Sequence, residues 1–163
     1  MNKEYVPFSK TGNLSSLVLK YLENDLAIRP FYNRSASIKN FKLQCDEKQA
    51  SFSSQQREIL VNILKKQHAS LPNNQKVLDN IDTLSQTNTF TITTGHQLNL
   101  FTGPVYFLYK IIDAILLAKE LQKHHASYTF VPVFWLASED HDFEEINHFY
   151  FKGQKVRWNS KET

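Results

Sequence analysis

Two strand-like segments separated by a long apolar segment constrain the fold of this 163-residue chain more than any other feature. The first, Phe90–Thr93, alternates apolar and polar residues, and the second, Tyr128–Trp135, is almost continuously apolar, as in a strand covered on both faces. Between them, Val105–Leu121 is apolar nearly all round, so we expect a buried helix. A strand, a helix and a strand of these lengths predict a right-handed parallel crossover in an α/β fold.

Polar segments follow both predicted strands. Thr94–Asn99 follows the first strand, and Ser138–Asp142 follows the second. Because parallel strands point the same way, both segments are predicted at one edge of the sheet, where open α/β sheets bind ligands. Thr102 as a cap and Pro104 at the first helical position predict the start of the helix, whose free N–H groups and dipole favour anions. The sequence therefore predicts one ligand site built by both segments.

Composition and charge exclude several classes of protein. The formal charge of +3 and the absence of any run of five Lys or Arg residues argue against a nucleic-acid-binding protein. No uncharged apolar run of about 18 residues occurs, so no membrane span is predicted. The single cysteine, Cys45, excludes an internal disulfide and fits a reducing compartment, and by exclusion we expect a cytoplasmic protein. Cys45 lies in no activating pattern, so we do not expect it to be a nucleophile.

The chain is expected to divide into a helical lead-in, residues 1–88, and the start of an α/β core, residues 89–163. Helical spacing of apolar residues predicts helices over residues 14–23, 53–68 and 73–84, the last two as an antiparallel pair that packs on the core. The crossover begins late in the chain, and a sheet of only two strands would have exposed edges. We therefore expect a truncated fragment, the front part of a larger fold.

Three local features predict the backbone around and after the second strand. Pro132 cannot donate to a ladder, so it predicts a bulge or a sheet edge on that side. Asp142–Phe149 is predicted to be one short helix. Gly153 lies between two apolar segments and predicts a hairpin-like ending.

The segment Glu139–Asp142 places three carboxylates around one imidazole. Such a cluster suits acid–base chemistry or the binding of an amine. Asp140 and Asp142 could also join His141 as metal ligands, although adjacent residues chelate one ion only where the backbone bends sharply. The structural alternative is a capping box, in which Asp142 caps a helix and pairs with Glu145. Capping would use Asp142 and leave Asp140 and His141 free.

His96 and Lys110 each have a functional and a structural interpretation. His96 could donate to a substrate oxygen or stabilise developing charge, or it could only bond nearby backbone, and Gln97 and Asn99 leave the same choice. Lys110 lies three residues before Asp113, and an ion pair between them is favoured over a contact with a nucleotide phosphate. The sequence lacks the Gly-rich phosphate signatures of dinucleotide folds and P-loops.

Two motifs together resemble the bacillithiol biosynthesis cysteine-adding enzymes, a family of cysteine ligases. The motifs that carry the resemblance are Thr94–Gln97, Leu100–Pro104 with Tyr109–Lys110, and Pro132–Phe143 with Glu145–Asn147. Many members of the family have Gln where this chain has His96. The resemblance implies a Rossmann-like core preceded by a helical segment, with a coiled-coil arm used for homodimerisation in full-length members.

The resemblance also implies the reaction. Family members join cysteine to the amine of glucosaminyl-malate, the last step in making the thiol bacillithiol. Amide formation requires an activated cysteine carboxylate, with ATP or another nucleotide as the expected cofactor, and no metal is implied. The expected catalytic residues are Asp140, His141 and Asp142, one of them as general base. The expected substrate- or nucleotide-binding residues are Thr94, Gly95, His96, Gln97, Asn99, Gly103, Lys110 and Glu139.

Two other classes of function stay open. The chain could be a non-catalytic binding or assembly segment that docks its apolar helix against a missing region. It could instead belong to a metal-dependent hydrolase that uses Asp140–Asp142, and such a protein would purify with stoichiometric divalent metal. In the ligase interpretation, we expect the fragment alone to be inactive.

Overall fold

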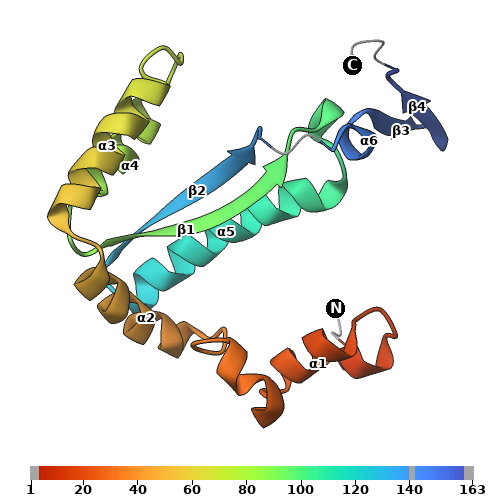
Figure 1. The fold of residues 1–163 in the computed structure, drawn as a ribbon, viewed down its shortest axis with the longest axis horizontal. Coiled ribbons are helices and arrows are strands. Elements are labelled where there is room, and N and C mark those ends of the chain that lie inside the picture. Colours follow the sequence, from red (N-terminus) through yellow and green to blue (C-terminus); the bar gives the residue numbers. More distant parts are fainter. Residues whose placement is uncertain (1–3, 140–141, 160–163) are drawn as a thin grey trace. The chain divides into compact units, whose positions relative to one another are not determined.

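The computed structural model describes residues 4–139 and 142–159. The chain forms two compact units, Met1–Asp46 and Glu47–Thr163. The elements are η1 Phe8–Lys10, α1 Ser16–Leu22, η2 Leu26–Phe31, α2 Ile38–Ser51, α3 Ser54–His68, α4 Gln75–Thr83, β1 Thr89–Gln97, η3 Leu100–Thr102, α5 Val105–His124, β2 Thr129–Ala137, α6 Phe143–Ile146, β3 His148–Phe151 and β4 Gln154–Arg157 (Figure 1). None of the described helices is long and apolar enough to cross a membrane. The boundary expected at residues 88 and 89 falls between α4 and β1 and stays a prediction.

The first unit consists of short helices joined by polar turns. Ser15 caps α1 by accepting a hydrogen bond from the Val18 N–H at 3.4 Å, which confirms a helix within residues 14–23. The rings of Tyr21 and Tyr32 meet edge-to-face with centroids 5.0 Å apart and hold α1 against η2. Cys45 is buried in α2, and this burial raises the pKa of its thiol to about 11, so the thiol stays protonated.

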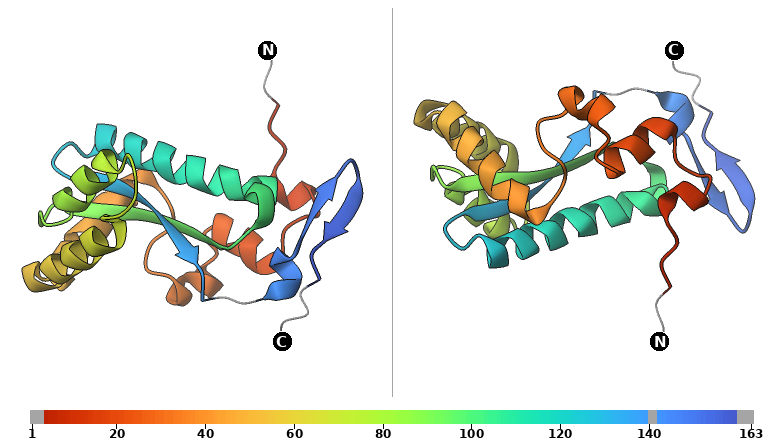
Figure 2. Two further views of the ribbon diagram at one scale, coloured as in Figure 1. Left: turned by 90° about the horizontal axis from the view of Figure 1, so that it is seen from above. Right: turned by 90° about the horizontal axis from the view of Figure 1, so that it is seen from below.

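The second unit contains the predicted parallel crossover. β1 and β2 pair in parallel from Thr89 opposite Thr129 to Gln97 opposite Ala137, without a bulge. Among the described residues the sheet has only these two strands, so Pro132 lies in an edge strand, one of the two outcomes that its missing N–H predicts. In two views α5 runs along the length of the sheet (Figure 2).

β1 is longer than the sequence suggested. We expected a polar loop from Thr94, but the strand continues to Gln97 and pairs with β2 throughout. Gly95 permits this pairing, because a Cβ there would lie 2.8 Å from the carbonyl oxygen of Trp135. The polar composition of residues 94–97 predicted a loop. Backbone hydrogen bonds to a neighbouring strand form whether the side chains are polar or apolar, so the strand continues through this segment.

α5 covers one face of the sheet and is only partly buried. Phe107 packs edge-to-face on Phe134 with ring centroids 5.3 Å apart, and Ala114, Ala118 and Leu121 are buried further along the helix. The expectation of a helix buried all round is wrong, because large apolar side chains elsewhere on α5 are exposed. They include Leu108, Ile112 and Leu116. A helix contacts a two-stranded sheet along only one stripe of its surface. Among the described residues, nothing covers the other sides of α5.

The start of α5 also differs from the prediction. Pro104 is the N-cap residue and Val105 is the first helical residue, with no side-chain hydrogen bond at the cap. The N-cap position expected at Thr102 is thus occupied by Pro104, and the backbone of Thr102 belongs to η3. The N–H groups of the first turn of α5 consequently have no side-chain cap, and no acidic residue lies in that turn.

α3 and α4 pack together and cover the other face of the sheet near the beginning of the strands. Val61 of α3 and Ile81 of α4 form a hydrophobic cluster with Leu84, the C-cap residue of α4, and with Val131 of β2. The buried guanidinium of Arg57 donates to three backbone carbonyls of the α4–β1 connection. These acceptors are Leu84 O at 3.0 Å, Thr89 O at 3.0 Å and Thr87 O at 3.2 Å. This core holds β1 and β2 at the ends remote from the polar segments.

The C-terminal part of the second unit is a short helix and a hairpin. The single helix expected over Asp142–Phe149 is wrong, because α6 ends at Ile146 and β3 begins at His148. The hairpin predicted around Gly153 is confirmed, and positive φ angles at Lys152 and Gly153 form its turn. Asp142 is the N-cap of α6 but makes no side-chain hydrogen bond there, so the expected capping box is wrong.

Candidate functional site

The segments that follow β1 and β2 leave the sheet at the same edge. The register pairs His96 with Leu136 and Gln97 with Ala137, so the two strands end side by side. The convergence predicted from the sequence is therefore confirmed as far as the strand ends and the residues that directly follow them. Of the second segment, Asp140 and His141 lie outside the described residues.

Strand alternation divides the expected binding residues between the two faces of the sheet. His96 contacts the rings of Tyr106 and Phe107, so its side chain faces α5. Thr94 lies two residues earlier and shares that face. Gly95 and Gln97 belong to the opposite face, where Trp135 is 58% exposed. Both faces of the carboxyl edge thus carry residues of the expected set.

Glu139 joins this second face. The indole Nε1–H of Trp135 donates to Glu139 Oε1 at 3.3 Å, and both side chains are exposed. This hydrogen bond holds the Glu139 carboxylate beside Trp135, the residue of β2 that lies against Gly95. Asp142 is exposed at the start of α6 and is the only member of the expected catalytic set whose position the structure describes.

The α5 face carries a polar cluster of Asn99, His96 and Tyr106, here called the Asn99–His96–Tyr106 cluster. Asn99 Nδ2 donates to Gln97 O at 2.8 Å and lies 2.9 Å from His96 Nδ1. On the other side of the ring, His96 Nε2 lies 3.0 Å from the hydroxyl oxygen of Tyr106. The imidazole is therefore fixed at both nitrogens, from the connection after β1 and from the first turn of α5.

Gly103 makes room for this cluster. Its φ of 58° and ψ of −149° belong to a region that is essentially restricted to glycine. A Cβ at Gly103 would lie 2.6 Å from both Cγ and Oδ1 of Asn99. Phe101 in the same connection has a left-handed backbone, with φ and ψ both 47°. This connection is therefore strained, and its glycine is needed for the position of Asn99.

Lys110 lies on the half-buried side of α5, one turn after Tyr106. The structural interpretation, an ion pair with Asp113, is wrong, because no ion pair joins these two described residues. Its contact with a phosphate stays a prediction.

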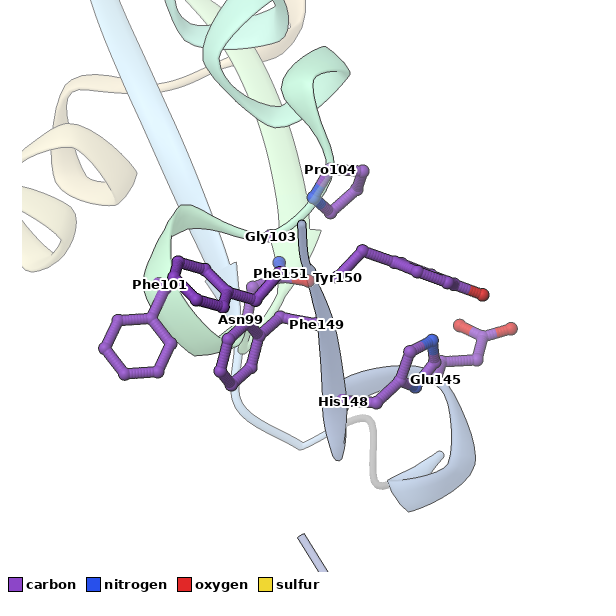
Figure 3. Close-up of a pocket in the computed structure, with 9 residues that line it drawn as sticks. All are labelled: Asn99, Phe101, Gly103, Pro104, Glu145, His148, Phe149, Tyr150 and Phe151. Carbon is purple, nitrogen blue, oxygen red and sulfur yellow. The ribbon is translucent and has the colours of Figure 1, made fainter. Parts of the chain in front are cut away.

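A cavity of about 830 Å³ lies between the connection after β1 and the C-terminal hairpin. Its lining, drawn in Figure 3, consists of Asn99, Phe101, Gly103, Pro104, Glu145, His148, Phe149, Tyr150 and Phe151. Phe101 and Phe149 meet edge-to-face with ring centroids 4.8 Å apart, so aromatic side chains join the two walls. Asn99 and Gly103 were expected in the site from the sequence, whereas Glu145, His148 and Tyr150 were not. The spacing of Glu145 and His148, three positions apart beyond the acidic cluster, was the available signal.

Within residues 4–139 and 142–159, no group of three or more His, Cys, Asp and Glu side chains is arranged to hold a metal ion. The expected metal alternative involved Asp140 and His141, which lie outside those ranges. The hydrolase alternative is therefore untested.

Fold and site together define the class of the protein. A parallel crossover with polar segments at the carboxyl edge of its strands is typical of the ligand-binding end of a Rossmann-like α/β domain. The whole chain, residues 1–163, matches the family described as bacillithiol biosynthesis BshC, N-terminal Rossmann-like domain, and belongs to that family.

Curated relatives agree with this assignment. Proteins named "Putative cysteine ligase BshC" from Flavobacterium psychrophilum and Flavobacterium johnsoniae are 49% and 48% identical over 161 residues, which cover 98% and 99% of this chain. A relative with the same name from Bacillus cytotoxicus is 34% identical over 146 residues, 88% of the chain. The chain spans about 30% of the length of the two Flavobacterium relatives and 26% of the Bacillus relative. The resemblance inferred from the two motifs is confirmed.

Proposed function

We propose that the protein to which this chain belongs is a ligase that joins the carboxyl group of cysteine to the amine of glucosaminyl-malate, and that this chain supplies part of the active site. Family membership and the names of its relatives support a ligase. The observation that supports the proposal is the shared edge at which β1 and β2 end, because both polar motifs follow directly from these strand ends.

The segments after β1 and β2 have opposite roles in the proposed reaction. The cysteine carboxylate is activated at the expense of ATP or another nucleotide, and the sugar amine attacks the activated carbonyl carbon. A C–N bond forms, the bond to the activating group breaks, and the amine loses a proton. The segment after β2 supplies the acceptors for that proton and for the ammonium form of the amine. Asp140, His141 and Asp142 are the candidates, with Glu139 beside them.

The segment at the end of β1 suits the anionic groups of the reaction. The first turn of α5 has free N–H donors and no acidic residue, so it favours carboxylate or phosphate oxygens. The backbone of Gly95 and the side chains of Thr94, His96, Gln97 and Asn99 belong to this side of the site. Gly103 acts through the backbone conformation that it allows. In the full-length protein we also expect a homodimer, as the resemblance implies.

The test is ligation by the full-length protein with cysteine, ATP and glucosaminyl-malate, followed by mass spectrometry of the product. Asp140→Ala and His141→Ala are expected to lower kcat by about 100-fold or more, the range for loss of a general acid or base. Asp113→Asn removes an exposed carboxylate of α5 and serves as the control. Turnover at the wild-type rate in both alanine variants would reject the assignment, and no product from the wild-type protein would reject the ligase proposal.

A further inference from the structure

The cavity of about 830 Å³ beside the connection after β1 has no ligand in the proposed function. Its volume lies in the range of sites for drug-sized molecules, roughly 300 to 1,000 Å³, so a molecule as small as cysteine would leave most of it empty. Figure 3 shows Glu145, His148 and Tyr150 toward one side of the cavity and the rings of Phe101 and Phe149 toward the other. The chemistry of these side chains indicates the class of the ligand.

Glu145 gives the cavity a carboxylate without a cation. Its side chain makes no ion pair with any described residue, whereas its neighbour Glu144 pairs with Arg157 of β4. The described residues that line the cavity include no Lys or Arg, and Lys152 approaches only the Phe151 ring, with Nζ 5.6 Å from its centroid. A carboxylate that no cation compensates attracts a positively charged group and repels phosphate. The cavity therefore suits an ammonium group and not a nucleotide.

His148 adds a polar atom next to this carboxylate. His148 and Tyr150 share one face of β3, and their rings meet edge-to-face with centroids 5.9 Å apart. His148 Nδ1 lies 3.2 Å from Asn147 Oδ1, whereas Nε2 has no partner among the described residues. A hydroxyl group both donates and accepts, so it can bond to Nε2 in either tautomer of the ring. The polar side of the cavity thus fits a hydroxylated molecule with a cationic group.

Aromatic rings form much of the remaining wall, and they are open to a ligand. Phe101 is 77% exposed, Tyr150 69% and Phe151 60%. Exposed apolar side chains beside polar groups are typical of ligand-binding grooves, and the faces of aromatic rings attract cations. Phe101 is held in this wall by a left-handed backbone, a strained conformation that is concentrated at ligand-binding sites.

We propose that this cavity binds an amino sugar, with the ammonium group at the Glu145 carboxylate, a hydroxyl group at His148 Nε2 and the sugar ring against the aromatic side chains. The inference rests on the proposed ligase function, in which the amino sugar is glucosaminyl-malate, and it names the part of the site that holds this substrate. Asn99 lines the cavity from the end of β1, and Glu145 lies three residues after Asp142. The cavity therefore borders both segments of the proposed site.

The decisive variant is Glu145→Gln in the full-length protein, because it retains the shape of the side chain and removes its charge. We expect the Kd of glucosaminyl-malate, measured by calorimetry, to rise by about 10-fold or more, with the affinities for cysteine and ATP unchanged. Glu144→Gln is the matched control, since Glu144 is the adjacent carboxylate of α6, does not line the cavity and makes only an exposed ion pair. Wild-type affinity in Glu145→Gln, or weaker binding of cysteine alone, would overturn the proposal.

The N-acetylated form of glucosaminyl-malate tests the ammonium contact itself. Acetylation removes the positive charge, so the wild-type protein should bind the acetylated compound about 10-fold or more weakly than the amine. Glu145→Gln should bind both compounds with nearly equal affinity, because the contact that distinguishes them is absent. A merely structural role of Glu145 would weaken both compounds to the same extent. An equal loss on acetylation in both proteins would therefore refute the contact.

Binding is measured without turnover, so this inference and the ligase proposal fail separately. If the wild-type protein binds glucosaminyl-malate more tightly than Glu145→Gln does but makes no ligation product, the proposed function alone is rejected. If the product forms and Glu145→Gln retains the wild-type KM for glucosaminyl-malate, the inference alone is rejected. Failure of the wild-type protein to bind the compound would also overturn the inference.

Discussion

Replacement of Gly103 by alanine tests whether the connection after β1 is built around Asn99. The change acts in two ways. The backbone at φ 58° and ψ −149° costs about 1 to 3 kcal/mol for a residue with a side chain. The new Cβ would also lie 2.6 Å from Asn99 Cγ, so the asparagine must move. Its hydrogen bonds to Gln97 O and His96 Nδ1 would then be lost, at about 1 kcal/mol each.

Together these terms predict that Gly103→Ala lowers the free energy of unfolding by about 3 to 5 kcal/mol. Gly12→Ala is the matched control, because Gly12 has a φ of 70° but nothing lies within 4 Å of a Cβ there. The control should cost only the backbone term, about 1 to 2 kcal/mol. Urea denaturation of the full-length protein measures both values, and a ligation assay should show loss of activity in Gly103→Ala only. Equal stability and equal activity in the two variants would refute this explanation of Gly103.

Two further predictions concern buried groups outside the site. Arg57→Met should lower the free energy of unfolding by about 3 to 5 kcal/mol, because it leaves three carbonyls of the α4–β1 connection without their charged donor. Arg29→Met is the control at an exposed arginine, and it should change the denaturation midpoint far less. Burial raises the pKa of the Cys45 thiol from 9.0 to about 11 in the folded protein. The free energy of unfolding should therefore fall as the pH rises from 9 to 11, and the thiol should have no effect on it below pH 9. Alkylation by iodoacetamide should accordingly be much slower in the native than in the urea-denatured protein at pH 9, and equal rates would contradict the burial of this thiol.

The crossover could be predicted because its signals are local and strong. A continuous apolar segment such as Tyr128–Trp135 has few alternatives to a buried strand, and parallel pairing follows from the intervening helix. The same rules failed at the end of β1. Thr94 to Gln97 is polar and contains glycine, which is typical of a loop, but the backbone pairs with β2 because Gly95 admits Trp135.

Burial of α5 could not be predicted from composition. The sequence shows which side chains are apolar, but the number of neighbours available to cover them depends on the rest of the fold. Within the described residues, a sheet of two strands covers only one stripe of the helix, and Ile112 and Leu116 stay exposed. The capping box at Asp142 did not form, and the backbone of Asp142, with φ −66° and ψ 82°, lies outside the extended region typical of an N-cap residue.

The sequence predicted which residues belong to the candidate site, but not how their side chains contact one another. His96 and Asn99 were identified, but their partner Tyr106 was not, because an aromatic residue in an apolar helix is typical of a core position. Only the distances from His96 Nε2 and Nδ1 to their neighbours show that Tyr106, Asn99 and the Gln97 carbonyl surround the ring. A sequence pattern cannot contain that information.

The central claim is that the segments after β1 and β2 form one active site. The most direct measurement is a crystal structure of the full-length protein with cysteine and a non-hydrolysable ATP analogue. We expect ligand atoms in contact with His96 or Asn99 from one segment and with residues of Glu139–Asp142 from the other. Ligands bound at a surface that touches neither segment would contradict it.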